Sequence, residues 1–190
     1  MARERKFALN ELYEMVKELL LIHGYEGFTF SLLAEQMDVS RATIYKYFNN
    51  KDELITEFMI HELKGFLAEL RNINNYNTFD EQFDFLLEKI FNRKNVNYFI
   101  EMGKLVDGKN DQKVKKNQEE LGKLHLEMYH LLQNFITLGK KENVFKQDVP
   151  DSLILGFIFQ AIAIPNHFQI PKHEWDKHLK DVIKYGLLAK

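Results

Sequence analysis

Apolar side chains recur at helical spacing along almost the whole chain, and this restricts the fold more than any other feature of the sequence. The first segment shows an apolar stripe and an acidic stripe: Ala8, Leu12, Met15, Val16, Leu19 and Leu20, and Glu11, Glu14 and Glu18. No segment has the period-2 alternation of a half-buried strand, and the 190 residues include only 3 prolines. The sequence therefore predicts an all-α protein with about nine helices.

Composition and charge exclude several classes of protein. A hydrophobic content of 45% predicts a folded chain, and the absence of cysteine removes disulfides, thiolate metal sites and cysteine nucleophiles. The N-terminus lacks a signal-peptide core, and the longest apolar run, Leu153 to Ile164, is shorter than the roughly 17–25 residues of a membrane span. We therefore expect a cytoplasmic protein. The net charge of −2 gives no general reason to expect binding to nucleic acid.

Capping residues indicate where the helices begin. Thr29 and Ser40 are suited to cap two short helices that end near Met37 and Phe48. Capping boxes at Asn50/Glu53 and Thr78/Glu81 predict two further starts, the first opening a helix to about Leu70. Asp148 is expected to cap a helix with Pro150 in its first turn. The other expected helical segments are 96–106, 112–140, 152–164 and 173–188.

The spacing between residues 33 and 44 is typical of a helix-turn-helix. Ala34 is a small residue where two helices would cross closely, and residues 38–40 form a tight turn. Ile44 and Phe48 define the buried side of the following helix. Its other side carries hydrogen-bonding side chains that suit base edges or phosphates: Arg41, Thr43, Tyr45, Lys46 and Tyr47. Lys51 stands at the next helix N-terminus, where a phosphate is favoured.

These residues resemble the signature of the TetR family of bacterial transcriptional regulators over about residues 7–58. The resemblance rests on Gly24-Tyr25, Phe28-Thr29, Leu33-Ala34, Val39-Ser40, Thr43-Ile44-Tyr45, Tyr47-Phe48, Lys51 and Leu54. Asp38 and Ala42 depart from it, since the family often has glycine at both positions. Because aspartate tolerates the left-handed conformation better than most residues, we expect the turn at Asp38 to survive.

The resemblance implies a set of DNA-binding residues. Arg41, Ala42 and Tyr45 are expected to face bases, and Arg41 is the best candidate for reading a guanine. The expected phosphate contacts are Thr29, Ser31, Thr43, Lys46, Tyr47 and Lys51. Arg3, Arg5 and Lys6 form either an arm that reaches DNA or a merely solvated terminus.

The resemblance also implies a ligand cavity in the C-terminal helices. The expected domains are a helix-turn-helix domain (1–50), a connecting helix and linker (51–75) and a ligand-binding and dimerisation domain (76–190). The ligand is expected to be small and largely apolar or aromatic. Its predicted lining is Tyr98, Glu101, Met102, Leu105, His125, Met128, Tyr129 and Leu132. Glu101 has an alternative as a surface partner of Lys104. Histidine spacings of five do not favour a metal site, and neither a cofactor nor an enzymatic acid–base pair is expected.

The helix expected at 152–164 is apolar nearly all round, so it needs cover on both sides. Together with the last helix it predicts a homodimer interface: Leu153, Phe157, Gln160, Ile164, Trp175, Leu179 and Ile183. An internal helix in a monomer is the alternative. With this interface, the resemblance implies a homodimeric regulator, a repressor that a ligand releases from a double-stranded, pseudo-palindromic DNA operator. A helical protein-interaction adaptor, or an activator without a small ligand, remains the alternative.

Overall fold

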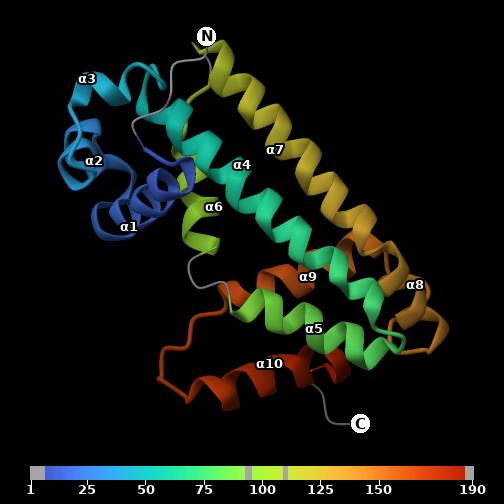
Figure 1. The fold of residues 1–190 in the computed structure, drawn as a ribbon. Coiled ribbons are helices and arrows are strands. Elements are labelled where there is room, and N and C mark those ends of the chain that lie inside the picture. Colours follow the sequence, from blue (N-terminus) through green and yellow to red (C-terminus); the bar gives the residue numbers. More distant parts are fainter. Residues whose placement is uncertain (1–6, 93–95, 109–110, 187–190) are drawn as a thin grey trace. The chain divides into compact units, whose positions relative to one another are not determined.

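A computed structural model describes residues 7–92, 96–108 and 111–186, and every regular element in these ranges is a helix (Figure 1). The predicted all-α class is confirmed. The α-helices are α1 (Leu9–Gly27), α2 (Phe30–Gln36), α3 (Arg41–Ile44), α4 (Lys51–Leu70), α5 (Phe79–Phe91), α6 (Val96–Leu105), α7 (Gln112–Leu131), α8 (Gln133–Lys141), α9 (Asp151–Gln160) and α10 (Lys172–Tyr185). Two 3₁₀ turns, Arg71–Asn75 and Ala161–Ala163, complete them.

The chain divides into two compact units. The first unit comprises Met1–Lys64 and Tyr98–Leu124, and the second comprises Gly65–Asn97 and His125–Lys190. This grouping differs from the predicted domains, which assigned all of 76–190 to one C-terminal domain. The physical reason is that Met102, Val106 and Val114 are buried in the same apolar core as the N-terminal helices.

The core of the first unit is built by the apolar stripes of its helices. Leu12, Leu20, Leu33 and Ile44 are fully buried in it. At Gly24 the backbone takes φ 68° and ψ 179°, and one more turn follows to Gly27. Glycine adopts this positive φ without a steric penalty, so it marks the bend in α1.

The turn between α2 and α3 has the predicted left-handed residue. Asp38 takes φ 49°, Val39 N donates to Ala34 O at 3.0 Å, and Asp38 N donates to Glu35 O at 3.2 Å. These two bonds form the Schellman arrangement that closes a helix. The expectation that aspartate preserves this turn is confirmed.

An aromatic cluster forms much of the core of the second unit. The rings of Phe79 and Phe135 stack with their centroids 5.1 Å apart, and Phe145 meets both edge-on at 5.1 and 5.7 Å. Phe83 stacks on Phe79 at 5.5 Å. These rings come from α5, α8 and the segment after α8, and they fix how α5 and α8 pack.

The helices of the C-terminal half differ from their expected bounds in several places, and α9 ends at Gln160 where the sequence predicts a helix to 164. The helix expected at 112–140 is two helices, since the backbone bends at Leu132 (φ −91°, ψ 2°). Asp148 does not cap the next helix: Pro150 does, and its carbonyl accepts from Leu153 N at 3.0 Å. The last helix ends at Tyr185, where Gly186 takes φ 82°. Within the described ranges, no helix has the length and apolar character that crossing a membrane requires.

Candidate nucleic-acid interface

Three segments of the first unit bring the predicted DNA-binding residues together: the start of α2, the α3 region and the start of α4. Thr29 caps α2, and its hydroxyl accepts from Leu32 N at 3.2 Å. Thr29 and Ser31 are exposed, as a phosphate contact requires. The Ser40 hydroxyl caps α3 by accepting from Thr43 N at 3.2 Å.

The helix of the α3 region is shorter than predicted. The sequence favours a helix over 41–48, whereas α3 ends at Ile44 and residues 45–47 form turns. The Ile44 carbonyl accepts from Tyr47 N at 2.9 Å and from Phe48 N at 3.1 Å. Ile44 and Phe48 are buried as expected, so these turns still anchor the segment to the core.

Arg41 and Tyr45 form one exposed unit on the outer side of α3. An Arg41 Nη donates to the Tyr45 hydroxyl at 3.0 Å, and the guanidinium carbon lies 5.3 Å from the centre of the tyrosine ring. The tyrosine ring in turn meets the edge of buried Phe30 at 4.9 Å. Tyr45 therefore holds Arg41 against a fixed surface, and a guanidinium held in this way is suited to bidentate contact with a guanine.

Two predicted phosphate contacts lie differently from expectation. Thr43 was expected on the exposed side, but it is only 4% exposed and its hydroxyl hydrogen-bonds with that of Ser40 at 2.8 Å. Thr43 thus serves the helix cap. Tyr47 is half-buried, with its ring edge-on to buried Phe7 at 5.3 Å. Ala42 and Lys46 are exposed as predicted. The arm of Arg3, Arg5 and Lys6 lies outside the described residues.

Lys51, at the first position of α4, is held by the end of α1. Its ammonium donates to the Tyr25 carbonyl at 3.0 Å and lies 4.0 Å from the centre of the Tyr25 ring. The Tyr25 hydroxyl donates to Asp52 at 2.7 Å. Burial raises the pKa of Tyr25 well above its ordinary value, and the bond to Asp52 raises it further, so this hydroxyl stays a donor.

The capping box predicted at Asn50 and Glu53 forms in part. Asn50 Oδ1 accepts from Glu53 N at 2.8 Å, as expected for an N-cap. The Glu53 carboxylate reaches one residue further back than in a standard box, where it accepts from the backbone and side-chain nitrogens of Asn49 at 2.9 and 2.8 Å. The box predicted at Thr78 and Glu81 is complete.

The predicted ligand-lining residues divide between the two units. Tyr98, Met102 and Leu105 belong to the first unit, where Met102 is buried in the core and Tyr98 donates to Leu20 O at 3.1 Å. The structure does not describe the side chain of Glu101. The others belong to the second unit: Met128 and Leu132 are buried, Tyr129 is half-buried and His125 is exposed.

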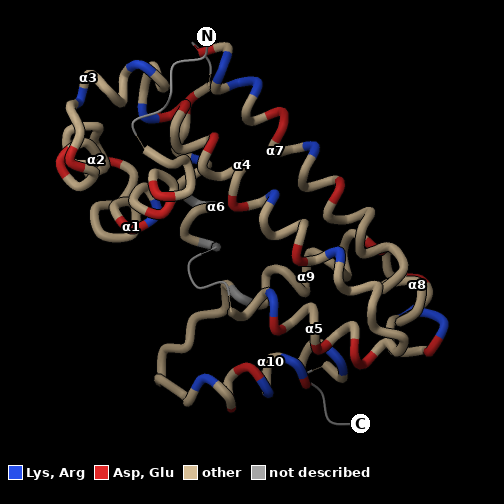
Figure 2. The backbone as a smooth tube through the Cα atoms, viewed as in Figure 1, with Lys and Arg blue, Asp and Glu red and all other residues tan. Residues whose placement is uncertain are grey.

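The predicted dimer residues behave differently on α9 and α10. On α9, Leu153 and Phe157 are 61% and 56% exposed, and Gln160 is exposed too. Ile164, which follows α9, is 45% exposed. After Asp151, α9 carries no charged residue (Figure 2). On α10, by contrast, Leu179 is buried within the chain, and Trp175 and Ile183 are half-buried. Ion pairs of Lys180 with Asp84 and Lys184 with Asp80 hold α10 against α5.

Comparison with known proteins finds a family model and a curated protein that are similar to parts of this chain. Residues 17–58, from the middle of α1 into α4, match the sequence model of bacterial regulatory proteins of the tetR family. An uncharacterised HTH-type transcriptional regulator of Haemophilus influenzae is 31% identical over 100 residues, which are 52% of this chain and 51% of that protein. The match therefore spans about half the length of this curated relative.

Two solved structures share the fold over nearly the full chain. The transcriptional regulator FadR from Bacillus subtilis, in complex with stearoyl-CoA, has a TM-score of 0.71 at 15% identity, covering 95% of this chain and 100% of that one. A transcriptional regulator from Saccharomonospora viridis, in complex with choline, has a TM-score of 0.72 at 16% identity, covering 95% and 97%. Residues 17–58, which contain the helix-turn-helix, thus resemble the DNA-binding segment of the tetR family of bacterial regulatory proteins.

Proposed function

We propose that this protein is a homodimeric, sequence-specific transcriptional regulator that represses from a pseudo-palindromic operator until a small, largely apolar ligand binds. The observation that supports this proposal best is the exposed pair of Arg41, the first residue of α3, and Tyr45, the residue that follows its end. A guanidinium presented by the second helix of a helix-turn-helix suits the major groove, where it distinguishes guanine by about 1–3 kcal/mol. The protein is a regulator and not an enzyme, and it acts in the cytoplasm, where a bacterial operator lies.

The remaining residues of the interface have supporting roles. Thr29, Ser31, Lys46 and Lys51 supply phosphate contacts that set the orientation on the duplex. Thr43 acts through the Ser40 cap, and Tyr47 acts through its packing on Phe7.

The exposed face of α9 supports the proposed dimer. Leu153, Phe157 and Gln160 are spaced by four and three residues, so they share one face of the helix. An exposed apolar helix face of this kind favours burial against a second copy of the chain. Two copies would place two α3 segments in successive major grooves about 34–36 Å apart.

The ligand proposal rests on the apolar interior of the C-terminal helices and on the ligands of the structural relatives. FadR was solved with stearoyl-CoA, and the S. viridis regulator with choline. An apolar site favours the acyl chain over the small cation, so we expect stearoyl-CoA, but not choline, to raise the Tm and to release the operator. If neither compound nor a panel of apolar molecules raises the Tm and releases the operator, the proposal of a small ligand is wrong. An activator or adaptor without a small ligand then becomes the better account.

Selection of binding sites from randomised DNA duplexes at about 150 mM salt tests the DNA-binding function. Wild type should enrich a two-fold symmetric site, and Arg41→Ala should lose the preference for one base pair in each half-site while it keeps non-specific affinity. Lys146→Ala, which removes an exposed lysine from the second unit, is the control and should enrich the same site as wild type. Enrichment of no site by folded wild type would refute the proposed function.

A further inference from the structure

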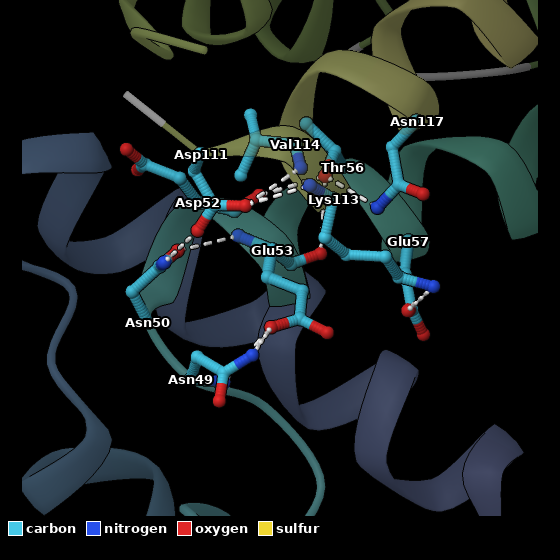
Figure 3. A network of polar contacts seen from close by, with 10 residues as sticks. All are labelled: Asn49, Asn50, Asp52, Glu53, Thr56, Glu57, Asp111, Lys113, Val114 and Asn117. Atoms are coloured by element: carbon cyan, nitrogen blue, oxygen red, sulfur yellow. Dashed lines mark hydrogen bonds and ion pairs between the residues drawn. The ribbon is translucent and has the colours of Figure 1, made fainter. Parts of the chain in front are cut away.

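Two helix caps in the first unit are joined side chain to side chain (Figure 3). Asn50 caps α4 through its Oδ1, which accepts from Glu53 N, and its Nδ2 donates to Asp111 Oδ2 at 2.6 Å. Asp111 caps α7 through its other oxygen, which accepts from Lys113 N at 2.8 Å and from Val114 N at 3.1 Å. The starts of α4 and α7, 61 residues apart in sequence, are therefore held together by the residues that begin each helix.

Further polar contacts extend this link along the two helices. Asn117 Nδ2 donates to Thr56 Oγ1 at 2.9 Å, and these residues are only 5% and 1% exposed. Thr56 Oγ1 donates in turn to the Asp52 carbonyl at 2.8 Å. Lys113 pairs with Glu57 at 3.0 Å. Buried polar groups that satisfy one another favour one relative position of two helices, since any shift leaves a donor or acceptor unpaired.

The link lies next to the phosphate-binding end of α4. Asn50 immediately precedes Lys51, and Thr56 bonds the carbonyl of the residue that follows Lys51. Asp111 lies outside the segment that resembles the DNA-binding domain of the family, which ends near residue 58. Hydrogen bonds from Val114 N and Asn50 lower the pKa of Asp111, so the carboxylate remains an acceptor at neutral pH.

We infer that Asp111 is a positioning residue for DNA binding: through Asn50 it fixes the start of α4 so that Lys51 meets the operator phosphate. This inference rests on the proposed function and assigns part of the DNA interface to the first turn of α7. Asp111 itself carries a negative charge and makes no phosphate contact. Asp111 therefore strengthens operator binding through its hydrogen bond to Asn50, although its negative charge alone would weaken it.

The chemistry of the pair allows a test by exchange. In Asp111→Asn the remaining carbonyl oxygen still caps α7, but the new NH₂ faces the NH₂ of Asn50, so the link is lost. In Asn50→Asp two carboxylates face each other. The double exchange, Asn50→Asp with Asp111→Asn, keeps both caps and restores the link with the hydrogen bond reversed. It also moves the negative charge next to Lys51, so electrostatics alone predicts weaker DNA binding than in either wild type or Asp111→Asn.

The experiment measures affinity for the selected operator over a range of salt concentrations, for wild type, the two single variants, the double exchange and Lys51→Ala. We expect Asp111→Asn to weaken binding about three- to tenfold, the scale of one hydrogen bond, without changing the salt slope. The double exchange should return to within about twofold of wild type. Lys51→Ala removes a direct phosphate contact, so it should reduce the slope of log affinity against log salt concentration by about 1 per protomer.

Each other result has a definite meaning. If Asp111→Asn binds the operator as tightly as wild type, or more tightly, the positioning role is wrong. If the double exchange binds as weakly as Asp111→Asn in spite of an unchanged urea midpoint, the link does not act through the hydrogen bond and the inference also fails. If wild type binds no operator, the proposed function fails and the inference fails with it. Urea unfolding of wild type, the two single variants and the double exchange measures the coupling of residues 50 and 111 independently of DNA. Each single variant should lose stability, and the double exchange should recover it.

Discussion

Two glycines in helices should respond in opposite directions to the same substitution. Gly122 lies in the middle of α7, and no atom is within 4 Å of the position that a Cβ would take there. At Gly139 in α8, a Cβ would lie 2.5 Å from Phe145 Cδ2 and 2.7 Å from Phe79 Cε2. Both rings belong to the stacked cluster of the second unit, so they have little room to move.

The magnitudes follow from two effects. Replacing a helical glycine with alanine gains about 0.8–1.0 kcal/mol of helix propensity, and this gain applies at both positions. Overpacking a core costs about 1–3 kcal/mol, and this cost applies only at Gly139. We therefore expect Gly122→Ala to stabilise the protein by about 1 kcal/mol. Gly139→Ala should be less stable than Gly122→Ala by about 1–3 kcal/mol.

Urea unfolding followed by circular dichroism measures both free energies. Gly65→Ala, a second exposed position with no atom within 4 Å, should repeat the gain at Gly122 and serves as the control. If Gly139→Ala were as stable as Gly122→Ala, the packing of α8 on the aromatic cluster would be wrong. A loss of stability in all three variants would show that helix propensity does not govern the open positions.

Three further changes have expected outcomes. Phe157→Lys, on the exposed face of α9, should convert the dimer to a monomer in analytical ultracentrifugation, whereas Leu126→Lys, at a 65% exposed position of α7, should not. Thr78→Val should lower stability at neutral pH. The Thr78 hydroxyl lowers the pKa of Glu81 in the folded protein, so the ionised carboxyl stabilises the fold above the pKa that Glu81 has in the unfolded chain. This stabilisation is lost as pH falls through the pKa of the folded state, so the variant should lose less stability than wild type below about pH 5. Urea midpoints measured against pH test this. Tyr45→Phe keeps the ring but loses the bond to Arg41, so base preference in duplex selection should weaken while the urea midpoint stays unchanged.

Local sequence signals predicted much of the fold. The N-caps at Thr29 and Ser40, the left-handed turn at Asp38 and the capping box at Thr78 all depend on residues within a few positions of one another, and the structure confirms them. The sequence did not predict that α3 ends at Ile44, four residues before the expected end. Thr43 was also expected outside, whereas it is buried and its hydroxyl hydrogen-bonds with that of Ser40.

Long-range packing explains what the sequence did not reveal. An amphipathic pattern shows that a helix buries one face, but it does not show which partner covers that face. Residues 98–124 have such patterns, and the structure groups them with the N-terminal helices. The bond between Asn50 and Asp111 joins two residues that each have an ordinary local explanation as a cap, so only their proximity in space reveals the link.

The most direct test of a dimeric DNA regulator is the dependence of affinity on half-site spacing. Once the operator is selected, five base pairs inserted at its centre move one half-site by half a turn of the duplex, to the opposite face. Two α3 segments related by a fixed dimer axis cannot then occupy both half-sites, so we expect affinity at about 150 mM salt to fall at least about 100-fold, toward that of non-specific DNA. Unchanged affinity for the lengthened site would contradict recognition by a dimer.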